Sequence, residues 1–289
     1  MEKKRFGDRR DGRLIRNLDG LHAVMPHLMP HRADAEVYLA AEMDVTEALD
    51  YIRRKNEGEE YRATLFHCFV MAVAKTVWMR PRLNRFVSGR RLYQRDEITL
   101  SFVVKRRFED RSEESLMVTT AREDWTLSEV TQKIVGKVHQ VREQGSYGVD
   151  GALNAVGRLP RWLIALIVWG YRTLDFFGRV PKSLAAGDPN YATVLLSNLG
   201  SIRSPAVYHH LNNYGTNSIL VTIGTIHKKE VFREDGSRTV RDIVDVGITL
   251  DERIADGFYF GRSWKIVQHL LAHPELLDRP LKEEIDFEC

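Results

Sequence analysis

The sequence has few cysteines and only a small excess of basic over acidic residues. Cys68 and Cys289 are its two cysteines, so neither a disulfide framework nor a cysteine-based metal site is predicted, and a reducing cytoplasm is the expected compartment. The 43 basic residues exceed the 40 acidic residues by a formal charge of +3, which is too little over 289 residues to indicate a nucleic-acid partner. The N-terminus has basic residues but no apolar segment behind them, so no secretory signal is predicted.

The chain also lacks an apolar run long enough to cross a membrane. Within 159–178, the uninterrupted apolar part extends from Trp162 to Tyr171, about half of the roughly 20 residues that a spanning helix needs. Trp162, Trp169 and the flanking arginines would also suit a helix in a membrane interface. The favoured interpretation is a buried or subunit-covered helix, and contact with a membrane surface is the less favoured alternative.

Helical and strand patterns alternate in the first half, and strand patterns dominate the second. Strands are predicted at 36–45, within 91–105, and at 115–120, 193–196 and 218–226, followed by a hairpin around 234–237, and helices at 46–56, 64–80, 126–144 and 263–271. Thr46 is predicted to cap the first helix, and Thr126 and Glu129 to form a capping box at the third. The second helix is predicted to carry one apolar stripe, formed by Leu65, Phe69, Val73 and Val77. Residues 1–20 are predicted to form an extended basic arm, and 21–289 a single domain in which 147–190 looks inserted. This order predicts an α/β or α+β fold with one mixed sheet.

Three short motifs follow one another along the chain. Pro81–Asn84 reads P-R-L-N, Ser197–Gly200 reads S-N-L-G, and Asp251–Gly257 reads D-E-R-I-A-D-G. In this order they resemble motifs of the 2-oxoacid dehydrogenase acyltransferase catalytic domains and the chloramphenicol acetyltransferases, whose last motif is H-x-x-x-D-G. Asp256 and Gly257 match that motif, but Glu252 stands in the place of its histidine.

The resemblance implies a two-layer fold in which helices flank a mixed sheet. It also implies a homotrimer with each active site at a subunit interface, where coenzyme A or an acyl-coenzyme A meets a small-molecule or thiol acceptor. No lipoyl module is recognised, so the chain resembles the stand-alone catalytic domain, without a covalently attached lipoyl group. By resemblance, Ser197 donates to the oxyanion, Asn198 and Gly200 of the same turn contact the coenzyme, and Asp256 pairs with a cation to orient the loop.

The motif's histidine has a clear chemical purpose. A thiol of pKa near 8.5 is mostly protonated at neutral pH, so a positioned base must accept its proton as sulfur attacks an acyl carbonyl. Glu252 can accept a proton, but a carboxyl of pKa about 4.3 is a weaker base than imidazole and would repel an anionic intermediate. No other histidine has the motif's spacing to Asp256; His209 and His210, on a predicted short helix, are better explained as surface or core residues, and no histidine pattern indicates a metal site.

Two hypotheses follow. The first is a coenzyme A-dependent acyltransferase in which Ser197 stabilises the oxyanion and Glu252 occupies the position of the base. The second is a catalytically inactive relative that acts as a trimeric binding or assembly protein. The family resemblance favours the first, whereas Glu252 favours the second.

Overall fold

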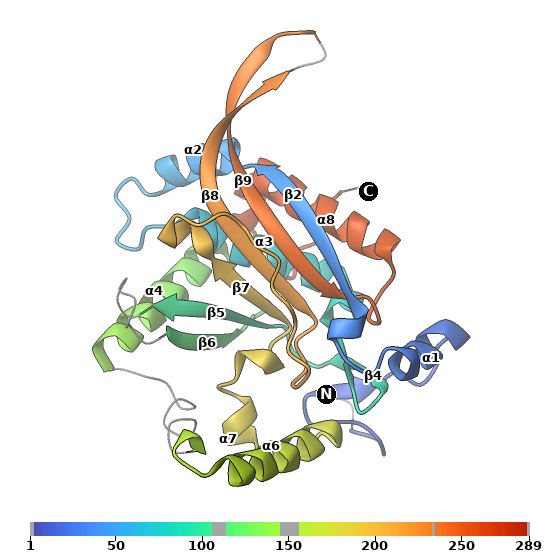
Figure 1. Cartoon of the computed structure of the whole chain (residues 1–289). Helices are drawn as coiled ribbons and strands as arrows, with labels where there is room; N and C mark the ends of the chain where they lie inside the picture. The colour runs from blue at the N-terminus through green and yellow to red at the C-terminus, as the bar shows by residue number, and fades with distance from the viewer. Residues whose placement is uncertain (1–2, 106–113, 145–155, 233–234, 288–289) are drawn as a thin grey trace.

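A computed structural model describes residues 3–105, 114–144, 156–232 and 235–287. A mixed six-stranded sheet forms its centre, with β5, β7 and β8 parallel and the outer pairs antiparallel (Figure 1). In spatial order the strands are β2 (Glu36–Asp44), β9 (Arg238–Asp251), β8 (Ile219–Phe232), β7 (Val194–Asn198), β5 (Thr99–Lys105) and β6 (Glu114–Thr120). The predicted α/β fold with a mixed sheet flanked by helices is confirmed.

A small second sheet, which was not predicted, contains β1 (Gly12–Leu14), β4 (Arg91–Arg95) and β3 (Arg85–Ser88). The α-helices are α1 (Gly20–Leu28), α2 (Thr46–Lys55), α3 (Leu65–Met79), α4 (Leu127–Gln144), α6 (Arg161–Phe176), α7 (Lys182–Ala185) and α8 (Gly257–Ala272). The strand predicted within 91–105 is β5, and the first part of that segment forms another strand, β4, which belongs to the small sheet. The first part of the segment predicted as inserted, 147–155, lies outside the described residues.

The hydrophobic core lies between one face of the six-stranded sheet and helices α3 and α8. Phe69 of α3 and Phe260 of α8 line the same small internal space as Val221 of β8 and Ile248 of β9. Helix α3 is buried almost all round, including Lys75, whose Nζ donates to the carbonyl oxygen of Pro280 at 2.9 Å. The single apolar stripe predicted for α3 was therefore too narrow, since neighbouring elements cover its other faces as well.

Side-chain capping marks the start of α4 and α8, but not that of α2. The predicted capping box of α4 is confirmed, because Thr126 N donates to the Glu129 carboxylate at 2.9 Å and Glu129 N donates back to the Thr126 hydroxyl. The predicted N-cap of α2 is wrong: Val45 occupies that position, and the Thr46 hydroxyl accepts from Asp242 N instead. Helix α8 begins earlier than predicted, because the Asp256 carboxylate caps it.

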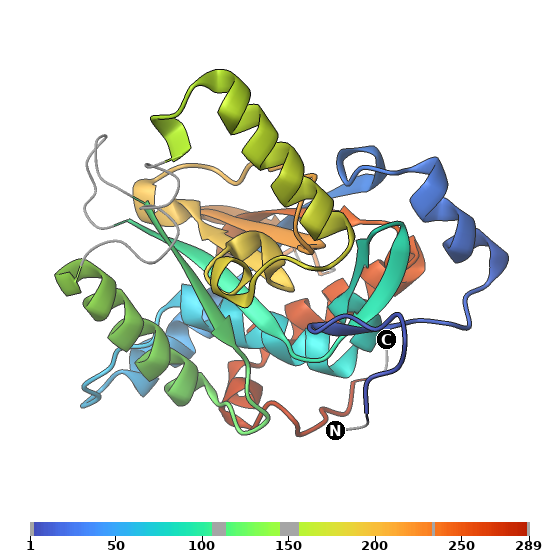
Figure 2. The ribbon, with the colours of Figure 1, turned by 90° about the horizontal axis from the view of Figure 1, so that it is seen from below.

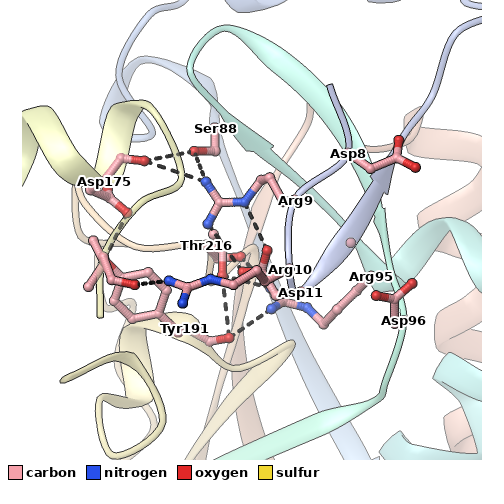
Figure 3. A network of polar contacts seen from close by, with 12 residues as sticks. Asp8, Arg9, Arg10, Asp11, Ser88, Arg95, Asp96, Asp175, Tyr191 and Thr216 are labelled. Carbon is pink, nitrogen blue, oxygen red and sulfur yellow. Dashed lines mark hydrogen bonds and ion pairs between the residues drawn. The ribbon is translucent and has the colours of Figure 1, made fainter. Parts of the chain in front are cut away.

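The N-terminal segment, predicted as an extended arm, is docked on the domain. Strand β1 pairs with β4, and the Arg9 side chain is 8% exposed. Its guanidinium donates to the Ser88 hydroxyl at 2.8 Å and to the main-chain oxygen of Asp175 at 3.4 Å (Figure 3). The segment therefore joins the small sheet to the end of α6.

On the face of the sheet opposite α3, residues 204–215 cross the strands without forming a helix; we call this segment the strap. The short helix predicted for His209 and His210 is therefore wrong. The strap lies so close to β8 and β9 that no side chain fits beneath it at two positions. A Cβ on Gly224 would lie 2.5 Å from Ala206 N, and one on Gly247 would lie 2.6 Å from Val207 O. The Thr222 hydroxyl also donates to Val207 O, at 2.6 Å.

Gly224 and Gly261 provide opposite tests of this packing. We expect Gly224→Ala to lower the free energy of unfolding by at least about 1 to 3 kcal/mol, because its Cβ would meet backbone atoms of the strap. Gly261→Ala in α8 has open space and should raise it by about 0.5 to 1 kcal/mol. Urea unfolding of both variants measures the difference, and equal stabilities would contradict the close strap contact.

His67 predicts a pH dependence of stability. Burial lowers its pKa from 6.5 to about 4, while its Nδ1 accepts from Thr64 N. Between pH 6.5 and pH 4 the unfolded chain binds a proton that the folded chain does not, so stability falls as pH falls, by up to roughly 3 kcal/mol from this residue. His67→Gln keeps an acceptor for Thr64 N, and its unfolding free energy should fall less steeply over that window; identical pH profiles would contradict the assignment.

Candidate functional site

The turn from β9 into α8 carries Glu252 and is held by a buried ion pair. Arg253 Nε and Nη2 donate to the two oxygens of Asp251 at 2.7 Å and 2.6 Å, and both side chains are at most 2% exposed. The third nitrogen, Nη1, donates to Met29 O at 2.7 Å. The main chain of Glu252 donates to Ala35 O at 2.9 Å, which ties the turn to the start of β2. Since Asp251 neutralises Arg253, the Arg253 charge is not available to pair with the half-buried Glu252 side chain.

Asp256 and Gly257 follow at the start of α8. The Asp256 carboxylate accepts from Tyr259 N at 2.8 Å, and its other oxygen lies 3.8 Å from Arg82 Nη1. Both side chains of this pair are about half exposed, so the ion pair itself adds little stability. Within this chain Gly257 is under no local constraint, because its φ is not positive and a Cβ there would meet nothing within 4 Å.

The S-N-L-G residues end β7 and turn toward β8. Ser197 and Asn198 are half-buried, and Ser197 pairs across the ladder with Thr222, on the face that the strap covers. Gly200 has a structural requirement, because a Cβ there would lie 2.5 Å from Gly224 O. The turn is therefore pressed against β8, and the Ser201 hydroxyl closes it by donating to Asn198 O at 2.7 Å.

The strand register separates Ser197 from Glu252 within one chain. Thr222, the partner of Ser197, is itself paired with Gly247 of β9, so two strand spacings, about 10 Å, lie between Ser197 and β9. Glu252 lies five residues further along the chain than Gly247, about 17 Å at 3.4 Å per residue. The two backbones are thus roughly 20 Å apart, too far for both side chains to contact one reacting carbonyl.

The strap histidines lie on the surface of the domain. His209 and His210 are exposed, their rings stack at 4.8 Å, and His209 Nδ1 lies 2.8 Å from His210 O. The strap is held at this point by Glu36 of β2, whose carboxylate accepts from Leu211 N at 2.5 Å. Among the described residues no group of three His, Cys, Asp or Glu side chains is placed to hold a metal ion.

An arginine-lined cavity adjoins the motif turn. It was not predicted from the sequence, and Arg253 is the only one of its arginines that lies in a recognised motif. The cavity measures about 190 Å³, and its charged lining residues include Arg32, Arg90, Arg172, Arg253 and Asp175. Arg32 is 6% exposed and bonds the carbonyl oxygens of Val87, Asn212 and Gly215, but its Nε has no partner in the structure. Burial lowers the Arg32 pKa. Because Arg253 is already paired with Asp251, the guanidiniums of Arg32, Arg90 and Arg172 supply the positive charge that a small anion such as a carboxylate or phosphate would need in this cavity.

Comparisons with known proteins agree with this architecture. Residues 181–278, which include both Ser197 and Glu252, match the family described as 2-oxoacid dehydrogenases acyltransferase (catalytic domain). The lipoamide acyltransferase component of the branched-chain alpha-keto acid dehydrogenase complex of Bacillus subtilis (strain 168) is 26% identical over 238 residues, which is 80% of this chain and 45% of that protein. The chain therefore spans less than half the length of this relative.

Solved structures share the fold at low sequence identity. A probable dihydrolipoamide acetyltransferase from Listeria monocytogenes 4b F2365 superposes with a TM-score of 0.59 at 17% identity, covering 90% of this chain and 94% of the other. The cubic core of a pyruvate dehydrogenase multienzyme complex has a TM-score of 0.61 at 13% identity, with 92% and 94% covered. A chloramphenicol acetyltransferase has a TM-score of 0.51 at 15% identity, with 90% and 99% covered.

The matched segment contains the S-N-L-G turn and the altered D-E-R-I-A-D-G turn, and the mixed sheet around them is the fold of these acyltransferases. The chain thus resembles the 2-oxoacid dehydrogenase acyltransferase catalytic domains over residues 181–278, and it shares their fold and that of a chloramphenicol acetyltransferase over about nine tenths of its length.

Proposed function

We propose that this protein is a coenzyme A-dependent acyltransferase whose active site is completed between copies in a homotrimer. The observation that carries the proposal is the separation of roughly 20 Å between Ser197 and Glu252 within one chain. Both residues lie in the segment that matches the family, yet neither can reach the other. A ring of three copies brings the Ser197 surface of one copy against the Glu252 turn of the next.

Each residue has one role in the proposed reaction. The acceptor, a small molecule or a thiol, attacks the acyl carbonyl of the acyl-coenzyme A while the Glu252 carboxylate takes its proton. The Ser197 hydroxyl of the other copy donates to the oxyanion of the tetrahedral intermediate. The intermediate then collapses, the acyl group stays on the acceptor, and the coenzyme A thiolate leaves and recovers the proton.

The buried pair of Asp251 and Arg253 supports Glu252 as the base. Because Asp251 accepts two bonds from Arg253, the Arg253 guanidinium is engaged by Asp251, and the half-buried Glu252 carboxylate is left to face the acceptor. Asp256 acts at a distance from the chemistry, by capping the helix that follows the turn.

A second candidate function rests on Glu252 itself. A carboxylate close to a developing oxyanion repels it, which neutral imidazole does not. A family member that had lost turnover would keep the trimer and its pocket for binding or assembly. The variants below separate the two functions.

Activity is tested by following free thiol release from acetyl-coenzyme A and a set of small acceptors. We expect Ser197→Ala to lower kcat by about 10²-fold to 10³-fold, because one oxyanion donor is lost. Glu252→Gln should lower it by about 10²-fold or more, because the base is lost, and Glu252→His should retain activity. Ser183→Ala, at an exposed serine of α7, is the matched control. No thiol release and no coenzyme A binding by the wild type would exclude the acyltransferase, and activity gained only in Glu252→His would favour the non-catalytic relative.

Mixing two inactive variants tests the shared site directly. When Ser197→Ala and Glu252→Gln chains are unfolded, mixed equally and refolded, about a quarter of the interfaces should join an intact Ser197 to an intact Glu252. Thiol release should then recover to about a quarter of the wild-type rate. Sedimentation should give three times the 33.4 kDa mass of one chain. No recovery in a folded mixed trimer would contradict the interface site.

A further inference from the structure

Helix α6 lies on the side of the sheet opposite α3, and only Asp175 of its residues is buried (Figure 2). None of the three sequence motifs lies in this helix. Its 16 residues extend about 24 Å, at 1.5 Å per residue, which is shorter than the hydrocarbon layer of a bilayer. In the described ranges no helix is long and apolar enough to cross a membrane.

One face of α6 fixes it to the domain. The Asp175 carboxylate accepts from Tyr191 Oη at 2.8 Å and Gly215 N at 2.9 Å, and its main-chain oxygen accepts from the Ser88 hydroxyl at 3.2 Å (Figure 3). One turn earlier, Tyr171 Oη donates to Tyr191 Oη at 3.1 Å. Because Tyr171 and Asp175 share one helical face, the helix is held along that face and its other faces project outward.

The outward faces are apolar and aromatic. Trp162 is 70% exposed and Trp169 66% exposed, and they lie seven residues apart, on the same side of the helix. The exposed large apolar side chains of this helix and the residue after it are Trp162, Leu166, Ile167, Val168, Trp169, Leu174, Phe176 and Phe177. A contiguous apolar surface of this kind marks a binding surface rather than ordinary exposure.

The charge around this surface is of one sign. Between 156 and 187 all five basic side chains are exposed, whereas the single carboxylate there, Asp175, is buried. These basic residues are Arg158, Arg161, Arg172, Arg179 and Lys182. Within 156–187 an apolar face with tryptophans is accompanied by exposed cations and no exposed carboxylate, which matches the composition of helices that lie in the interface of an anionic bilayer.

We propose that α6 docks the protein on the surface of an anionic lipid bilayer. The helix lies parallel to the membrane, with Trp162, Leu166 and Trp169 at the level of the headgroups and the basic side chains against the lipid phosphates. A second copy of α6 fits this surface poorly, because it would bring the same five cations against these five. The inference does not rest on the acyltransferase activity.

Vesicle sedimentation with the full chain tests the proposal. Vesicles of phosphatidylcholine with about one third phosphatidylglycerol should bind the protein about tenfold more tightly than phosphatidylcholine alone, and high salt should weaken that binding. The double variant Trp162→Ser/Trp169→Ser should lose about tenfold in affinity, and Arg161→Gln/Arg172→Gln should lose the preference for phosphatidylglycerol. Phe232→Ser, at an equally exposed aromatic residue of β8, should bind as the wild type does.

Two readouts distinguish the bilayer from a protein occupant. Tryptophan emission should shift to shorter wavelength on adding anionic vesicles, and the shift should disappear in the double tryptophan variant. No sedimentation with anionic vesicles, or binding that the tryptophan and arginine variants leave unchanged, would overturn the proposal. A lower oligomeric mass of the tryptophan variant without any vesicle binding by the wild type would assign α6 to a contact between copies instead.

Discussion

The buried ion pair between Asp251 and Arg253 is the interaction on which the motif turn depends. Two charges removed from water are costly unless every donor and acceptor is matched, and here the guanidinium bonds both carboxylate oxygens and Met29 O. The pair connects the end of β9 to the segment before β2. Glu252 lies between its two members, so the position of this carboxylate follows from a contact in which it takes no part.

The strap is the second constraint on the site. It passes over β8 and β9 at two glycines where side chains are excluded, and it covers the face to which Ser197 belongs. The close contacts at Gly200, Gly224 and Gly247 make the Ser197 turn, the two long strands and the strap into one rigid layer. Ser197 and Glu252 are therefore each well supported, but by different contacts and at different ends of the sheet.

Helix α6 follows a different design. A polar network, rather than a hydrophobic face, joins it to the domain: Asp175 bonds Tyr191, Gly215 and, through its main chain, Ser88. On the opposite face of the sheet, α3 is held by apolar contacts, because apolar side chains of the core enclose it. An amphipathic helix normally turns its apolar face toward the protein core. The outward apolar face of α6 is therefore consistent with the proposed contact with a lipid bilayer.

Much of the fold was predictable from the sequence, because helix periodicity, capping and strand patterns depend on residues that are neighbours along the chain. The periodicity of α3, the capping box at Thr126 and the apolar strands on either side of the S-N-L-G turn identified elements that the structure contains. Failures occurred where a distant partner decided the outcome. The Thr46 hydroxyl accepts from Asp242 N instead of capping its own helix, and residues 91–105 are divided between two sheets.

The sequence by itself indicated the acyltransferase-like fold, through the letters of two turns and their order. Only the tertiary structure decided how those turns relate in space, since strand register sets a separation that spacing along the chain does not contain. The structure likewise decided that Arg9 is nearly buried and that Trp162 and Trp169 are exposed, because both depend on which surfaces meet after folding. Periodicity shows that a helix has an apolar face, whereas the direction of that face is a property of the packed molecule.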